Sequence, residues 1–216
     1  MAAPILRKVA ARTEPYGLMP MGALHDAGRT LVLVATAPDF WHHFENSPEM
    51  SDGAPDPVDR WSQRILPRIA TGCGAREVVY PFGGPPFEPF IAWAKASGEA
   101  FDSPTGMLVH LRAGLMISYR GALVFEGQHP LPDANHRSPC DSCATRPCET
   151  ACPVGALSPD HFYDVPRCKA YLNSAEGADC MTNGCAVRRA CPVSVSFNRP
   201  PRQSAHHMRY FKGNAP

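Results

Sequence analysis

Eight of the nine cysteines in the chain form two sets of four, and both sets end in a Cys-Pro pair. The first set has the spacing C-x2-C-x4-C-x3-C-P and consists of Cys140, Cys143, Cys148 and Cys152. The second set consists of Cys168, Cys180, Cys185 and Cys191. Because four thiolates ligate one cubane iron–sulfur cluster, this count predicts two [4Fe-4S] clusters and leaves over only Cys73.

The spacing also predicts which cysteines hold which cluster. In the bacterial C-x2-C-x2-C-x3-C-P run, the first three cysteines hold one cluster and the fourth ligates the other. The proline after the fourth cysteine ends the loop and turns the chain away. Applied here, this crossing rule assigns Cys140, Cys143, Cys148 and Cys191 to one cluster, and Cys152, Cys168, Cys180 and Cys185 to the second.

The gap between Cys143 and Cys148 leaves the type of the first cluster open. It is four residues long, whereas the bacterial run has two at this place. In this respect the run is similar to that of the seven-iron ferredoxins, in which the second cysteine is not a ligand. Two interpretations follow: Cys143 ligates a [4Fe-4S] cluster, or it is a bystander beside a [3Fe-4S] cluster.

Zinc sites and disulfides are competing interpretations of the same cysteines. Structural zinc also uses four cysteines with C-x2-C spacing, and secreted cysteine-rich chains use disulfides. Neither explains two Cys-Pro endings, and the N-terminus shows neither a signal peptide nor a twin-arginine signal. We therefore expect a cytoplasmic protein, since thiols stay reduced in the cytoplasm and clusters can be assembled there.

Composition and charge argue against two classes of partner. The net charge of the 216 residues is +1 and no basic run occurs, so nucleic acid is not an expected partner. No apolar stretch reaches the ~18 residues of a membrane span. The length suffices for one large or two small domains with a buried core.

The residues before the cysteines predict a mixed α/β (α+β) domain over residues 1–135. Residues 128–133, close to its end, are predicted to be a linker. Residues 30–37 form an apolar run typical of a strand buried on both faces. Apolar residues at helical spacing after Asp56-Pro57 predict a helix that Asp56 caps and that Pro67 kinks or ends early. Further strands are predicted at 77–80, 107–111 and 115–119, a helix at 87–96, and a hairpin leading into 122–125.

Residues 136–216 lack long periodic segments, as expected where metal ligation replaces apolar packing. Only short helices are predicted, at 164–172 and 181–190. The tail from Val193, with Pro200-Pro201 and His206-His207, is predicted to be irregular, and its histidines are interpreted as solvated rather than as ligands.

This cysteine region resembles the dicluster module of epoxyqueuosine reductases and reductive dehalogenases. The matching stretches are Cys140 to Pro153 with Val154–Leu157, Arg167-Cys168 with Tyr171-Leu172, and Gly184-Cys185 to Pro192. The resemblance implies that residues 136–216 form a small ferredoxin-like domain whose two iron–sulfur clusters transfer electrons.

The N-terminal part resembles the cobalamin-processing CblC family, whose fold is related to flavin nitroreductases. Ala35–Phe40, Asp56–Asp59, and Gly106–His110 running to Arg120-Gly121 carry this resemblance. It implies a layered nitroreductase-like domain over residues 1–135 that binds cobalamin or FMN, with the cofactor-binding residues His110, Gly114 and Arg120. The chain departs from the family at Leu111, where the family has proline. A histidine in an apolar strand is also an ordinary core residue, so both interpretations of His110 stay open.

Taken together, these features predict a cytoplasmic iron–sulfur redox protein that passes electrons to a corrinoid or flavin in the N-terminal domain. Such a protein would be a corrinoid-dependent or corrinoid-reducing oxidoreductase, supplied by an electron donor such as a ferredoxin or flavodoxin reductase system. The alternatives are a non-enzymatic ferredoxin-like carrier whose N-terminal domain docks a partner, and an epoxyqueuosine-reductase-like enzyme. No residue can be assigned as a catalytic acid.

Overall fold

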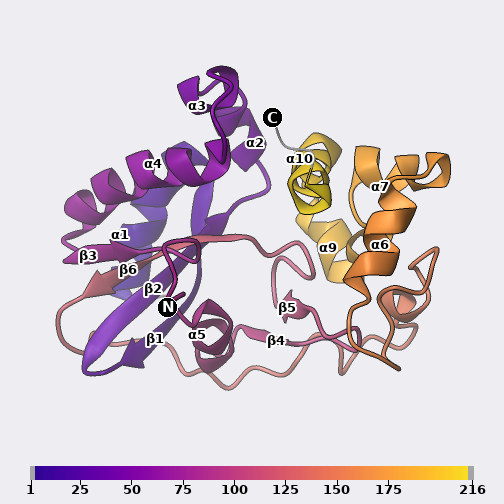
Figure 1. Ribbon diagram of the computed structural model, residues 1–216. Helices are drawn as coiled ribbons and strands as arrows, with labels where there is room; N and C mark the ends of the chain where they lie inside the picture. The colour runs from indigo at the N-terminus through magenta and orange to yellow at the C-terminus, as the bar shows by residue number, and fades with distance from the viewer. Residues whose placement is uncertain (1–2, 214–216) are drawn as a thin grey trace. The chain divides into compact units, whose positions relative to one another are not determined.

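The computed structural model describes residues 3–213 and divides them into two compact units (Figure 1). Unit one comprises the residues up to Ala100 together with Ser118–His136, and unit two comprises Phe101–Ile117 together with the residues from Arg137 onward. The fold class is mixed α+β, as predicted. The change of unit at His136 lies next to the predicted boundary, but the sequence did not indicate that residues 101–117 belong with the cysteine region.

Unit one is built on a four-stranded antiparallel sheet with the strand order β1-β2-β6-β3. The strands are β1 (Leu18–Asp26), β2 (Arg29–Thr36), β3 (Glu77–Val79) and β6 (Tyr119–Phe125). Every residue of β2 except Arg29 is buried, which confirms the buried strand predicted at 30–37. The strand at 77–80 is confirmed as the short β3.

Helices cover both faces of this sheet. Side chains alternate between the faces of a strand, and Val32, Val34, Leu123 and Phe125 all pack into the core that α1 (Pro4–Thr13) and α4 (Pro57–Cys73) complete. On the other face, α5 (Phe90–Ala96) contacts β1 (Figure 1). Ser97, at the end of α5, lies close to Gly22 of β1. The short helices η1 (Glu14–Tyr16), α2 (Phe40–Phe44) and α3 (Pro48–Ser51) complete the unit.

Helix α4 confirms the predicted helical segment and corrects two details of it. Asp56 adopts a left-handed conformation, with φ 52° and ψ 49°, and its side chain does not cap the helix. The helix also continues past Pro67 to Cys73. Pro67 is exposed, so the backbone hydrogen bond that proline cannot donate is lost on the solvent side, where water can replace it.

Unit two combines a small sheet with short helices. Its elements are β4 (Ala100–Asp102), β5 (Leu108–His110), η2 (Pro147–Glu149), α6 (Val165–Leu172), η3 (Ala175–Gly177), α7 (Ala178–Asn183), α8 (Ala186–Ala190), α9 (Pro192–Phe197) and α10 (Pro201–Lys212). No helix within residues 3–213 is both long and apolar enough to cross a membrane.

Two sequence predictions about these segments were wrong. The strands near 107–119 do not form a hairpin with 122–125, because β5 pairs with β4 whereas β6 pairs with β2 and β3. The tail after Val193 is helical, since Pro192 and Pro201 each occupy the first turn of a helix, where proline is tolerated. Helix α10 packs onto α7, and its buried side includes His206.

Candidate metal centre

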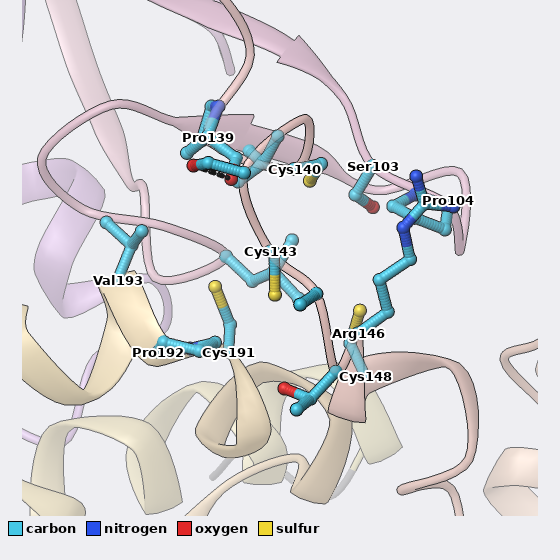
Figure 2. A pocket seen from close by; sticks show the side chains of 15 residues that line it. Ser103, Pro104, Pro139, Cys140, Cys143, Arg146, Cys148, Cys191, Pro192 and Val193 are labelled. Carbon is cyan, nitrogen blue, oxygen red and sulfur yellow. Dashed lines mark hydrogen bonds between the residues drawn. The ribbon is translucent and has the colours of Figure 1, made fainter.

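Four cysteines of unit two line one cavity, which we call site one. Its volume is about 380 Å³. Cys140 and Cys143 come from an irregular loop, Cys148 from η2, and Cys191 from the junction of α8 and α9. Figure 2 shows their sulfur atoms around the same central space. These are the four cysteines that the crossing rule groups together.

The rest of the wall of site one is mainly apolar. Val109 and Leu115 reach it from the 101–117 segment, and Pro139, Pro192 and Val193 lie beside the cysteines. Cys148 and Cys191 are buried, whereas Cys140 and Cys143 are partly exposed. The apolar wall therefore shields Cys148 and Cys191 more fully than Cys140 and Cys143.

The Cys191-Pro192 pair explains how a cysteine between two helices comes to line site one. Proline disfavours the helical conformation in the residue before it. Cys191 is accordingly extended, with φ −65° and ψ 123°, while Pro192 begins α9. The chain therefore breaks between α8 and α9 at the cysteine itself.

The other four cysteines line a second, much smaller cavity, which we call site two. They are Cys152, Cys168 on α6, Cys180 on α7 and Cys185 at the start of α8. The cavity measures about 20 Å³, and Tyr171, Leu172, Val187 and Met208 form part of its wall. A cluster would fit into site two only if these side chains moved apart. Met208 lies at one side of the cavity, and the flexibility of a methionine side chain favours such a movement.

Gly184 holds Cys185 in place beside the C-terminal helix. Its φ of 91° is a conformation that residues with a side chain rarely adopt. A Cβ atom at this position would lie 2.5 Å from the Cβ of Ser204 on α10. The close packing of α10 against the turn before Cys185 therefore depends on glycine.

Hydrogen bonds reach several of the cysteines. The backbone N–H of Ala156 donates to the Cys152 sulfur at 3.1 Å, and the N–H of Cys140 donates to the Ser138 hydroxyl at 3.2 Å. The hydroxyl of Tyr163 interacts with the Cys168 sulfur, which contributes to raising the pKa of Tyr163 after the larger effect of burial. The two donors to sulfur, at Cys152 and Cys168, are of the kind that stabilises thiolate ligands and tunes the reduction potential of a bound cluster.

The electrostatic environment separates the cysteines into the same two groups. Burial raises the pKa of the Cys140 thiol, and the neighbouring Cys191 and Cys143 raise it further. Burial likewise raises the pKa of Cys168, to which Cys185, Cys152 and Cys180 add. Cys140 and Cys168 therefore resist deprotonation, and a bound metal cation would favour their thiolate forms.

The four cysteines of each set line a cavity and do not converge on the position of a single metal ion. Among residues 3–213, no three His, Cys, Asp or Glu side chains lie close enough together to ligate a single metal ion. The two sites nevertheless share one apolar cluster, in which Leu157 and Val187 pack with cysteines of both sets.

The three residues implied as cofactor ligands are not brought together in one unit. His110 and Gly114 lie in unit two and form a tight turn through mutual backbone hydrogen bonds of 3.0 and 2.8 Å. His110 is fully buried, and its Nδ1 accepts from the N–H of Arg112 at 3.1 Å. Gly114 is needed because a Cβ there would lie 2.5 Å from the backbone nitrogen of Ser194.

Arg120 lies in unit one and has structural partners there. Its guanidinium donates to Asp59 and to the Ser62 hydroxyl, and it lies over the ring of Phe82 with 5.0 Å to the ring centre. The Asp56–Asp59 and Arg120-Gly121 stretches are thus joined by an ion pair. Cys73 is also in unit one, at the buried end of α4, where its pKa is raised by burial.

Sequence reasoning missed the part of site one that comes from residues 101–117. Leu115 is fixed there by its N–H, which donates to the Ser194 hydroxyl at 2.9 Å. Nothing in the spacing of apolar residues links this segment to cysteines far along the chain. Tyr163 was also missed, although its place five residues before Cys168 could have suggested it.

Comparison with models of known protein families gives no match for this chain, and no curated protein matches it either.

Proposed function

We propose that the chain is an iron–sulfur redox protein that holds two [4Fe-4S] clusters in unit two and transfers electrons through them. One observation carries the proposal: two separate cavities are each lined by four cysteines, in the groups expected from the crossing rule. This grouping is not the order of the cysteines along the chain, since Cys191 joins the first set and Cys152 the second.

The donor set of each site fits a cluster. Four thiols line a shared space at each site, and at site two the backbone N–H of Ala156 donates to the Cys152 sulfur, as it would to a thiolate ligand. Clusters bound here would supply one-electron transfer at potentials as low as about −700 mV. Cys143 lies among the other ligands of site one in Figure 2, so we include it as a ligand.

The side chains of unit two have two tasks in this proposal. The apolar residues of site one, such as Val109 and Leu115, would limit the access of water to the buried thiolates of Cys148 and Cys191. The apolar cluster containing Leu157 and Val187 includes cysteines of both sets, so electrons would pass through packed protein and not through solvent. We further propose a cytoplasmic location and a soluble reductase system as donor, because thiols must stay reduced for assembly.

The acceptor that we propose is a corrinoid or a flavin held by unit one. The support for this part is the resemblance of the N-terminal residues to the CblC family, together with an open cavity of about 660 Å³ beside α5. A non-enzymatic carrier is the second candidate, because Phe87 and Ile91 are 65% and 64% exposed near α5, as expected of a docking face.

Iron and sulfide analysis of anaerobically purified protein tests the cluster proposal. We expect about eight irons per chain and the electron paramagnetic resonance of reduced [4Fe-4S] clusters. Stoichiometric zinc without iron, in protein made under iron-replete conditions, would contradict it. Titration of the same protein with cob(II)alamin and with FMN tests the acceptor: binding of one of them supports the oxidoreductase, and binding of neither favours the carrier.

A further inference from the structure

Two arginines of unit two lie close together without an acidic partner. Arg188 on α8 donates to the backbone oxygen of Leu115 at 2.6 Å, and Arg199, just before α10, lies 3.3 Å from the sulfur of Met116. Both guanidinium groups are thus placed against adjacent residues of one segment. Within residues 3–213, neither of them has an Asp or Glu oxygen at ion-pair distance.

The surroundings of Arg199 are unfavourable for a lone cation. Its Nε is shielded from solvent and has no hydrogen-bond partner among the described residues. Burial, with the neighbouring Arg188 as second cause, lowers the pKa of Arg199 to about 9. Arginine nevertheless stays protonated in proteins, so the folded chain holds two neighbouring positive charges that repel each other.

A second polar group nearby in the sequence also lacks a partner. Gln203, in the first turn of α10, is fully buried, and neither its amide nitrogen nor its amide oxygen has a hydrogen-bond partner within residues 3–213. Buried charges are normally paired and buried polar groups are normally hydrogen-bonded. Among the described residues, the Nε of Arg199 and the amide group of Gln203 are therefore buried polar groups without a hydrogen-bond partner.

We propose that Arg188 and Arg199 form an oxyanion site that binds a phosphate group. The guanidinium fork matches phosphate oxygens with two parallel hydrogen bonds, and two such groups match the double negative charge of a phosphate better than the single charge of a carboxylate. The phosphate is either the free ion or the end of a phosphorylated cofactor such as FMN, which would then be held by unit two and not at the cavity proposed for unit one. The inference does not depend on the clusters, because no cysteine takes part in it.

The test is calorimetric titration of the anaerobically purified full chain with inorganic phosphate, FMN and riboflavin at low ionic strength. Binding of phosphate alone assigns the site to the free ion, whereas binding of FMN but not riboflavin assigns it to a phosphorylated cofactor. Either result must depend on the arginines: Arg199→Gln is expected to weaken binding roughly tenfold or more. Arg209→Gln removes the same charge from an exposed position of α10 and should change the affinity by less than about twofold.

Arg199→Lys is a second variant that keeps the test valid if Arg199→Gln does not fold. It keeps the charge but loses the fork, so it should bind phosphate more weakly than the wild type while keeping the wild-type iron content. The proposal is overturned if neither phosphate nor FMN binds at roughly 1 mM, or if Arg199→Gln binds as tightly as Arg209→Gln does. It is also overturned if phosphate does not bind and Arg199→Gln shifts a cluster potential, because the two arginines would then be counter-charges of a cluster.

Discussion

Site one and site two are each lined by four cysteines but are built in different ways. Site one lies in loops, with a cavity of about 380 Å³ and two partly exposed cysteines. Site two lies among the helices α6, α7, α8 and α10, and its cavity measures about 20 Å³. The difference indicates that the prolines and irregular backbone shape site one, whereas packing of helices shapes site two. Changes to helix packing should therefore affect the two sites unequally.

The largest expected effect comes from removing two cysteines at once. By the crossing rule, Cys140→Ala with Cys191→Ala removes ligands from one site and should leave about four irons. Cys140→Ala with Cys185→Ala removes a ligand from each site and should leave almost none. Iron analysis after anaerobic purification measures both.

Cys73→Ala is the matched control and should keep all the iron, because Cys73 lies in unit one. If the Cys140/Cys191 pair lost nearly all the iron while a Cys140/Cys152 pair kept half, the cysteines would be grouped in chain order and the assignment to sites would be wrong.

Gly184→Ala should damage site two while sparing site one. The new Cβ would meet Ser204 at 2.5 Å at a residue whose φ is 91°, which we expect to cost about 1–3 kcal/mol of unfolding free energy. Chemical denaturation gives the stability, and iron analysis should show the loss of about half the metal. Gly106→Ala is the control, since Gly106 has a φ of 74° but no atom within 4 Å of a new Cβ. Equal effects of the two changes would show that the contact with α10 is unimportant.

Cys143→Ala tests whether Cys143 is a ligand of the cluster proposed at site one. If Cys143 is a ligand, its removal should release one iron and give about seven irons per chain. The oxidised protein should then show the electron paramagnetic resonance of a three-iron cluster. A spectrum and iron content identical to those of the wild type would instead identify Cys143 as a bystander.

Tyr163→Phe should shift the potential of site two alone. Loss of the hydroxyl beside Cys168 removes a donor that stabilises the more negative, reduced state. A net hydrogen bond of ~1 kcal/mol corresponds to roughly 40 mV for one electron, so the potential should fall by about that much. A redox titration followed by electron paramagnetic resonance measures it, and an equal shift at both sites would contradict the assignment.

The smallest effect concerns pH and the helix that borders site two. Burial, with Arg209 as second cause, lowers the pKa of His206 to about 4, from 6.5 in the unfolded chain. The unfolded state therefore binds a proton that the folded state does not, so stability should fall as the pH drops from about 6.5 toward 4. Denaturation of the wild type and of His206→Gln across this range should show a shallower slope for the variant. Parallel curves would argue against a buried neutral His206.

The sequence predicted those elements whose signal is local. Residues 30–37 are apolar without interruption, and the helix after Asp56 has a clear apolar face, so both were found. Strand β1 was not predicted, because Pro20 and Gly22 interrupt its pattern at an irregularity in the pairing with β2. Helix α10 was not predicted, because two prolines at its start were interpreted as a sign of irregular chain.

The candidate site was predictable to a similar extent. Cysteine spacing is a local property with a known ligand logic, and the two groups that it predicts each line one cavity, while their role as cluster ligands stays a prediction. The difference between a wide and a tight site depends on which distant segments pack around the thiols, such as Leu115 and Met208. The two arginines at Leu115 and Met116 became visible only when the folded chain showed which charges lack a partner.

Unit two is built from two separate stretches of the chain, which limits how it can be cut out as a fragment or moved by recombination. The chain enters the cysteine unit after Ala100, leaves it at Ile117 to contribute β6 to the other unit, and returns after His136. A fragment starting at Arg137 would contain every candidate metal ligand but would lack Val109 and Leu115. The unit therefore cannot be transplanted as a cassette with one cut, and a recombination event that moved it intact would need junctions on both sides of β6.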